Sequence, residues 1–221
     1  MPTLYLMRHG QTEFNVAGLV QGHCDSPLTE LGCAQARAAR RWLAAQGIMP
    51  TRLISSPLGR ARATLSLLRS ELLDGMVESK GDRHDQRRPA NPSTPQPVPP
   101  LEIDDGLIER SYGSLEGGPR DQVPSDLWDP GEGVVAFGGE GSAALRERMV
   151  RTLTKIMHAP GSERVLAVSH GSAVAQFKAA WADRARCPQD VWIGNCFILV
   201  FDFDRKTGAF TNTGIIDPTG A

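Results

Sequence analysis

The stretch Thr3-Leu4-Tyr5-Leu6-Met7-Arg8-His9-Gly10-Gln11 decides the fold of this 221-residue chain. Its apolar first part begins with a threonine, a pattern typical of a short buried strand. A guanidinium, an imidazole and a glycine follow at once, at the strand end where open α/β sheets carry their ligand-binding groups. An imidazole beside a guanidinium suits a nitrogen nucleophile that attacks an anion held by the guanidinium. The alternative is a strand end that carries solvated polar residues.

The composition indicates a globular protein without a charged macromolecular partner. Hydrophobic residues make up 40% of the chain and the net charge is -1, so we expect neither nucleic acid nor a membrane as a partner. No signal-peptide core fits before Arg8, and no apolar run approaches the roughly 20 residues that span a bilayer. The cysteines lack the paired spacing of a metal or redox motif, and we expect reduced thiols in a cytoplasmic protein. They are Cys24, Cys33, Cys187 and Cys196.

The first half of the chain alternates strands and helices. A loop over residues 15–27 leads to a helix over 29–44, which Thr29 caps and Gly47 closes. A second strand over 52–55 runs into a helix that opens at Ser56-Pro57 and continues to about Leu73. Repeated strand–helix units predict a parallel or mixed sheet with helices packed on it.

Residues 78–100 interrupt this pattern with dense charge followed by prolines. A segment of this composition cannot build a core, and we predict a mobile or extended insertion. A partner-binding role is conceivable because its last prolines favour polyproline II, but an unconstrained loop is the simpler interpretation.

The second half of the chain returns to regular elements. We predict an amphipathic helix over residues 142–158, a buried strand over 164–168 and a helix over 172–182. Two final strands over 196–203 and 209–216 form a hairpin at the sheet edge.

His9-Gly10 and His170-Gly171 both follow a buried strand. Neighbouring strand ends bring such residues together across a large sequence separation, so we expect the two imidazoles in one site. A metal held by both histidines is the competing interpretation. It lacks a third ligand at a recognisable spacing, and Arg8 would repel the cation.

A third candidate is the helix that starts after Ser56. Arg60 and Arg62 lie about 200° apart around a helix, so at most one of them faces the strand ends. Thr64 shares the face of Arg60. The start of a helix also favours anions, so one of these arginines is a candidate for the site. The alternative is that both are ordinary solvated residues.

Five segments in order resemble the histidine phosphatase superfamily, also called phosphoglycerate mutase-like. They are residues 8–15, 21–32, 56–61, 107–117 and 169–171. The resemblance spans residue 3 to about 205 without the insertion. It implies a three-layer α/β/α sandwich with a mostly parallel mixed sheet and helices on both faces, in one domain over residues 1–221.

The resemblance also implies roles for single residues. His9 would accept a phosphoryl group as phosphohistidine, with its pKa lowered by flanking arginines and its tautomer set by a backbone carbonyl. Arg8, Arg60 and His170 would hold the phosphoryl oxygens, and Glu109 would act as general acid and then as general base. Neither metal nor another cofactor is expected, because these cations supply the positive charge. The substrate-binding residues would be Thr12, Asn15, Gln21, Gly22 and Gly171.

The same site serves a phosphatase or a phosphoglycerate mutase, and the rest of the substrate decides between them. Arg120 is the one candidate cation after the acidic segment. Residues 121–145 contain no Lys or Arg but five acids, which would repel a phosphoglycerate if this segment covers the pocket. Ser172 and Gln176 stand where family phosphatases often have Gly and Arg. We therefore predict hydrolysis of a small phosphorylated substrate. The alternatives are mutase-type transfer and a non-catalytic phospho-ligand-binding or scaffold protein.

Overall fold

The computed structural model describes residues 1–81 and 98–220. A six-stranded sheet with the order β3-β2-β4-β1-β5-β6 runs through the described chain. The first four strands of this order are parallel, and β5 and β6 are antiparallel to their neighbours. The strands are β1 (Thr3–Arg8), β2 (Arg52–Ser55), β3 (Leu101–Ile103), β4 (Arg164–Ser169), β5 (Ile198–Asp204) and β6 (Ala209–Ile216).

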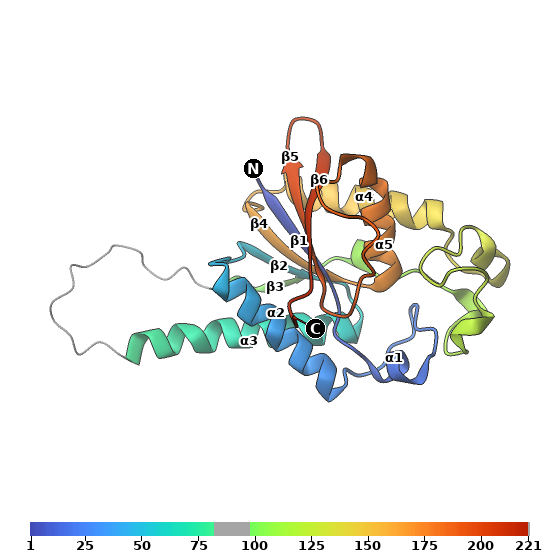
Figure 1. Ribbon diagram of the computed structural model, residues 1–221, viewed down its shortest axis with the longest axis horizontal. Helices are drawn as coiled ribbons and strands as arrows, with labels where there is room; N and C mark the ends of the chain where they lie inside the picture. Colours follow the sequence, from blue (N-terminus) through green and yellow to red (C-terminus); the bar gives the residue numbers. More distant parts are fainter. Residues whose placement is uncertain (82–97, 221) are drawn as a thin grey trace.

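Helices cover both faces of this sheet, which confirms the predicted three-layer α/β/α fold. Figure 1 shows α2 and α3 on one face and α4 and α5 on the other. The helices are α1 (Glu13–Ala17), α2 (Glu30–Ala45), α3 (Gly59–Gly81), α4 (Ser142–His158) and α5 (Gly171–Ala180). Short 3-10 helices occupy the connections at η1 (Asp105–Leu107), η2 (Gly113–Leu115), η3 (Arg120–Gln122), η4 (Gly133–Phe137) and η5 (Ala182–Arg184).

The central strands are apolar throughout because both of their faces are buried. Leu4 and Leu6 of β1 join the core beneath α4 and α5. Tyr5 and Met7 point the opposite way and join the core beneath α2 and α3. A strand that alternates between two cores reads as one continuous apolar run, as parallel strands do.

The pairing of the strands assembles the site. β1 and β4 are neighbours, with Arg8 opposite Ser169, so His9 and His170 leave the sheet side by side. β2 lies on the other side of β4 and leads directly into α3. The expectation that the strand ends bring these segments together is confirmed.

Two predictions around the insertion were wrong at their boundaries. α3 begins at Gly59 rather than at Pro57 and continues to Gly81, beyond the predicted end at Leu73. Residues 74–81 contain no proline, so the backbone N–H groups needed to extend the helix are present. Residues 82–97 of the predicted insertion lie outside the described residues. Its end is not extended in solvent, because Val98 is buried against the core beneath α2 and α3.

Other element ends also differ from the predictions. The predicted loop over 15–27 contains part of α1, whose first turn is stabilised by a capping box between Thr12 and Asn15. β5 starts at Ile198 rather than at residue 196, because Cys196 has a φ of 62° that no extended strand adopts. α5 begins at Gly171 and ends at Ala180, two residues before the predicted end.

Candidate active site

His9 leaves the end of β1 with its ring held by the backbone. Its Nδ1 lies 2.7 Å from the carbonyl oxygen of Gly10, which is the backbone acceptor that the sequence analysis expects. A carbonyl only accepts, so this contact places the ring proton on Nδ1 and leaves a lone pair on Nε2. The imidazole is therefore oriented as a nucleophile.

Burial and positive charge keep this ring neutral. The pKa of His9 lies well below its usual value, first because the side chain is buried and then because Arg60 and Arg8 repel a proton. The hydrogen bond to Gly10 opposes this shift. His9 is consequently unprotonated at neutral pH, the state that nucleophilic attack requires.

Arg60 lies in the first turn of α3 and is only 1% exposed. Its Nη1 donates to the carbonyl of Cys24 at 2.8 Å and to Asp25 at 3.0 Å, and its Nη2 donates to the carbonyl of Gly22 at 2.7 Å. Its buried Nε has no partner among the described residues. The guanidinium is therefore fixed by the loop before α2 and retains donor capacity.

The helical spacing of the arginines has the expected consequence. Arg62 is exposed, so only Arg60 faces the strand ends. Thr64 is buried, and its hydroxyl donates to the Arg60 carbonyl at 2.7 Å and accepts from the Gly10 N–H at 3.0 Å. α3 is thereby tied to the residue that follows His9.

Arg8 lies on the other side of the cavity floor. Its Nη1 donates to the Ile193 carbonyl at 3.0 Å, and its Cζ stands 4.6 Å from the ring centroid of Trp128. Burial lowers the pKa of Arg8 to about 10; Glu109 opposes the shift and Arg120 adds to it. Arg8 still carries its charge at neutral pH.

His170 is buried directly after β4. Its ring centroid is 5.2 Å from that of His9, and its Nε2 lies 2.7 Å from the Ser56 hydroxyl. Its buried Nδ1 has no hydrogen-bond partner within the described parts of the chain. Burial lowers the pKa of His170 well below its usual value, and Arg60 and His9 lower it further.

Glu109 follows η1 in the chain, and its buried carboxylate lies against the N-terminus of α5. One carboxylate oxygen accepts from the backbone N–H of Arg110 at 2.8 Å and of Ala173 at 2.9 Å, and the other accepts from the Ser172 N–H at 3.0 Å. A helix N-terminus with unpaired N–H groups stabilises a carboxylate in this position. Arg148 of α4 donates to the Glu109 carbonyl at 3.4 Å and steadies the segment.

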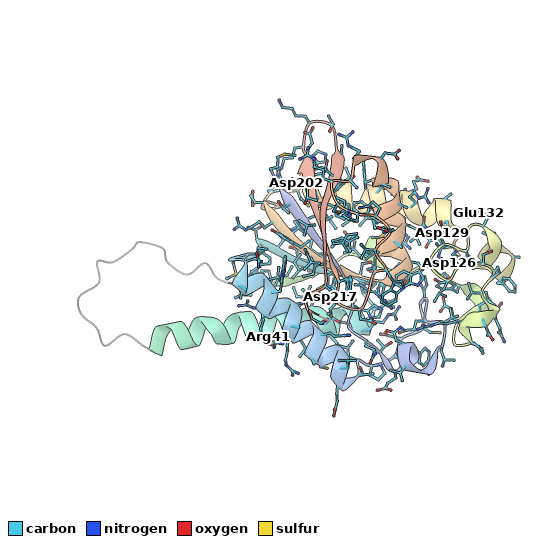
Figure 2. The ribbon with its side chains drawn as sticks, viewed as in Figure 1. Arg41, Asp126, Asp129, Glu132, Asp202 and Asp217 are labelled. Atoms are coloured by element: carbon cyan, nitrogen blue, oxygen red, sulfur yellow. The ribbon has the colours of Figure 1, made fainter. Side chains whose placement is uncertain are left out.

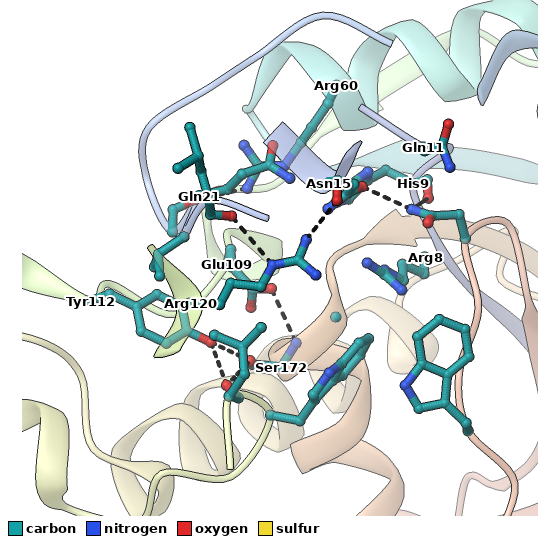
Figure 3. A pocket seen from close by; sticks show the side chains of 18 residues that line it. Arg8, His9, Gln11, Asn15, Gln21, Arg60, Glu109, Tyr112, Arg120 and Ser172 are labelled. Atoms are coloured by element: carbon teal, nitrogen blue, oxygen red, sulfur yellow. Dashed lines mark hydrogen bonds between the residues drawn. The ribbon is translucent and has the colours of Figure 1, made fainter. Parts of the chain in front are cut away.

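These groups open into a cavity of about 250 Å³. Figure 3 shows Arg8, His9, Arg60 and Glu109 around it. Of the other predicted site residues, Asn15, Gln21, Gly22 and Gly171 also line the cavity. The full lining is Arg8, His9, Gln11, Asn15, Leu19, Val20, Gln21, Gly22, Arg60, Glu109, Tyr112, Arg120, Leu127, Trp128, Gly171, Ser172, Trp192 and Asn195.

Two predicted site residues are absent from this lining. Thr12 is fully buried, and its hydroxyl accepts from the N–H of Asn15 and from the side-chain amide of Gln21. It positions two lining residues and does not reach the cavity. His170 is also fully buried, behind the floor of the cavity beside His9.

The cavity also contains Arg120, the candidate cation named from the sequence, and residues that the motifs did not indicate. Arg120 reaches into it, with its Nη2 3.3 Å from the Asn15 carbonyl and its Nε 3.5 Å from the Leu19 carbonyl (Figure 3). Burial raises the pKa of Tyr112, whose hydroxyl lies 2.7 Å from that of Ser172. Trp128 and Trp192 also line the cavity, and tryptophans in loops are a sign of a binding surface that the sequence does contain.

The expected repulsion by residues 121–145 is not supported. This segment does reach the cavity, through Leu127 and Trp128, but none of its five acids is among the lining residues. Figure 2 shows Asp126, Asp129 and Glu132 together on the lobe after η3. Glu140 pairs with Arg148 at 2.6 Å instead. Asp126, Asp129 and Glu132 accept hydrogen bonds from Trp128, Ser142 and Ala143. The cations of the cavity therefore have none of these acids beside them in the lining.

Two kinds of feature are absent from the described residues, 1–81 and 98–220. No helix there has the length and apolar character to cross a bilayer. No group of three or more His, Cys, Asp or Glu side chains is arranged to hold a metal ion.

Comparisons with known proteins place the chain in a family. The profile of the histidine phosphatase superfamily (branch 1) matches residues 4–81 and 86–215. A 2,3-bisphosphoglycerate-dependent phosphoglycerate mutase of Methylobacterium sp. (strain 4-46) is 33% identical over 183 residues, which cover 77% of this chain and 76% of the relative.

Solved structures agree on the fold. A phosphoglycerate mutase of Bacillus anthracis superposes with a TM-score of 0.71 at 21% identity, covering 98% of this chain and 92% of the other. A phosphoserine phosphatase of Entamoeba histolytica, in complex with 3-phosphoglyceric acid, gives 0.69 at 23% identity, with 97% and 96% covered. The matched profile spans nearly the whole chain, which therefore belongs to the histidine phosphatase superfamily.

Proposed function

We propose that this protein hydrolyses phosphomonoesters without a metal, through a phosphohistidine on Nε2 of His9. One observation carries the proposal. His9 is neutral, its Nδ1 is tied to Gly10, and it lies between Arg8 and Arg60 at the floor of a cavity. A lone pair beside two guanidinium groups attacks a bound phosphoryl group, because the guanidinium groups attract the anion and lower the charge on its oxygens.

The unused donors of the floor suit the transferring group. The Nε atoms of Arg8 and Arg60 are buried without partners in the described chain. Buried polar groups without partners are costly, and phosphoryl oxygens would satisfy them. Each donor aimed at the developing charge contributes about 3 kcal/mol to a transition state.

Glu109 supplies the proton transfers. In the first step the P–O bond to the leaving group breaks while Nε2 of His9 bonds to phosphorus. Glu109 enters this step as the neutral acid and gives its proton to the leaving oxygen, and the three backbone N–H groups then stabilise the carboxylate that forms. In the second step the Glu109 carboxylate takes a proton from water, the water oxygen bonds to phosphorus, and the P–N bond breaks. The cycle releases an alcohol and inorganic phosphate and restores His9.

Mutase-type transfer is the second candidate, and Arg120 favours it. A mutase must hold a second anionic group, and Arg120 is a third cation in the cavity. Two of the Arg120 nitrogens already face backbone carbonyls. Apart from Arg8, Arg60 and Arg120, none of the described lining residues is an arginine or lysine. Hydrolysis needs only one anionic group and therefore fits this cation supply better. A non-catalytic binding protein would not need the complete set of Arg8, His9, Arg60 and His170.

The test is hydrolysis of p-nitrophenyl phosphate in the presence of a chelator. We expect wild type to turn over and His9→Ala to lose at least about 10³-fold in rate, as removal of a nucleophile does. His158→Ala is the matched control, since His158 lies at the end of α4 against Phe203 and outside the cavity. Equal, negligible rates for wild type and His9→Ala would rule out an enzyme. Isomerisation of phosphoglycerates faster than their hydrolysis would establish the mutase instead.

A further inference from the structure

Two tryptophans form one wall of the cavity that the Proposed function uses. Trp128 lies in the loop after η3 and Trp192 in the loop before β5. Their ring centroids are 5.9 Å apart with an interplanar angle of 68°, an edge-to-face arrangement. Neither loop belongs to the motif segments that supply the floor of the cavity.

The protein itself covers Trp128. A Cβ added to Gly171 would lie 2.7 Å from the Trp128 ring, so this indole packs directly on the backbone at the start of α5. Arg8 stands over the same ring at 4.6 Å. Trp128 is therefore a fixed part of the wall.

Trp192 is different because its side chain is 66% exposed. Its neighbour Ile193 is buried, and the Ile193 carbonyl accepts from Arg8 at 3.0 Å, so the backbone beneath the indole is anchored. Large exposed apolar side chains at the edge of a polar cavity mark binding surfaces. The backbone that carries Trp192 is therefore fixed, and most of the indole surface is free to contact a ligand.

The distance from Arg8 fixes which part of a substrate would meet this indole. The Cζ of Arg8 lies 5.8 Å from the Trp192 ring centroid. A phosphoryl oxygen held by Arg8 sits within about 3 Å of a guanidinium nitrogen. A ring joined to the ester oxygen through a few bonds therefore falls against Trp192.

We infer that the preferred substrates are phosphomonoesters whose leaving group carries a flat aromatic ring that stacks on Trp192. This inference rests on the Proposed function. The ring comes either from a nucleobase or from a simple aryl group, since both present the same planar π face. An exposed indole binds such a ring by offset stacking and gains from the excluded water.

The experiment compares substrates that differ only by the ring. Adenosine 5′-monophosphate and ribose 5-phosphate release the same primary alcohol position, and 2-phenylethyl phosphate and ethyl phosphate form a second pair. We expect kcat/KM at least about 10-fold higher for the ring-bearing member, the size of one stacking contact. The pair with the larger ratio identifies the nucleobase or the aryl group as the source of the ring.

Variants of the loop assign the effect to the indole. Trp192→Ala should bring the ratio of the two kcat/KM values close to one, and Trp192→Phe should restore most of it. Val191→Ala, at the exposed neighbour outside the cavity, is the matched control and should keep the wild-type ratio. A Trp192→Ala variant that slows both members of a pair equally would overturn the inference, as would a higher kcat/KM for glucose 6-phosphate than for either ring-bearing compound.

Binding separates this inference from the Proposed function. Calorimetry on His9→Ala measures affinity without turnover, and we expect adenosine 5′-monophosphate or 2-phenylethyl phosphate to bind about 10-fold more tightly than its ring-free partner. That result together with no hydrolysis by wild type would refute the Proposed function and leave the aromatic site standing. Equal affinities within both pairs would overturn the aromatic site even if wild type hydrolyses all four compounds.

Discussion

The floor and the rim of the cavity are built differently. The floor consists of Arg8, His9 and Arg60, and His170 is buried directly behind it. All four residues stand at strand ends or in a first helical turn. The rim consists of Arg120, Trp128, Trp192 and Asn195, which belong to loops and a 3-10 turn. Hydrogen bonds of 2.7 to 3.0 Å fix the floor, whereas those of Arg120 are 3.3 and 3.5 Å. In the proposed mechanism a rigid scaffold therefore holds the reacting groups, and loops contact the rest of the substrate.

Removing a cation from the floor should have the largest effect. Arg60→Ala should lower kcat on p-nitrophenyl phosphate by about 10² to 10³-fold, because a buried donor to the developing charge is lost. Arg62→Ala is the control on the same helix. It is exposed two residues away, and we expect less than about a 2-fold change. Similar losses in both variants would mean that α3 tolerates no change there, and the floor would lose its special role.

Glu109 lines the same cavity, and the effect of removing its carboxylate on the rate should depend on the leaving group. Glu109→Gln should slow hydrolysis of ribose 5-phosphate by about 10²-fold, since an alkoxide needs a proton as it leaves. The loss should be much smaller for p-nitrophenyl phosphate, whose phenolate leaves unprotonated. Initial rates on the two substrates give the comparison, and equal losses on both would contradict a general-acid role.

The buried histidines should make stability depend on pH. The folded pKa of His9 lies well below the unfolded value of about 6.5, so below that pH the unfolded chain binds a proton that the folded chain does not. The free energy of unfolding should be level above about pH 6.5 and fall as the pH drops toward the folded pKa.

His9→Asn isolates one of these histidines. Loss of His9 should reduce the slope of the free energy of unfolding against pH by about 1.4 kcal/mol per pH unit below pH 6.5. Urea unfolding at pH 7.5, 6.5 and 5.5 measures this for wild type and the variant. His158→Asn, outside the cavity, controls for loss of a histidine as such. Identical slopes for wild type and His9→Asn would contradict a lowered pKa of His9 in the folded protein.

A change at the rim should have the smallest effect and should alter binding more than chemistry. Arg120→Gln should raise KM for 3-phosphoglycerate by about 5-fold, because one partly exposed contact to a second anionic group is lost. The effect on kcat should be smaller, since Arg120 does not touch the reacting atoms in the proposed mechanism. Steady-state kinetics separate the two constants. A loss in kcat comparable to that of Arg60→Ala would remove the distinction between floor and rim.

The floor could be predicted from sequence because its residues follow local rules. His9 and His170 each come directly after a buried apolar run, and helical phase allows only one of Arg60 and Arg62 to face the strand ends. The resemblance to the family selects Arg60. The structure places all three where this reasoning expects them, although His170 lies behind the cavity lining. Their catalytic roles stay predictions.

Thr12 shows where motif reasoning reached its limit. It belongs to the same segment as His9, and the resemblance implied substrate binding. Its hydroxyl instead caps α1, a local hydrogen bond that the pattern of a threonine before Glu13-Phe14-Asn15 also allows. Only the folded helix α1 decides whether the Thr12 hydroxyl caps the helix or faces a substrate.

The sequence by itself determined the strand–helix units of the sheet and the pairing of His9 with His170, because these depend on periodicity or on position relative to a strand. The helices on both faces and the choice of Arg60 rather than Arg62 came from the resemblance to the family. Tertiary structure alone decided the rim. Arg120 was only a candidate in the sequence, and Trp128 and Trp192 come from loops without periodicity. Loop packing turned five acids of one segment away from the cavity and left Trp192 exposed beside it. Side-chain direction in a loop depends on contacts with distant residues such as Gly171 and Ile193, and no local pattern records them.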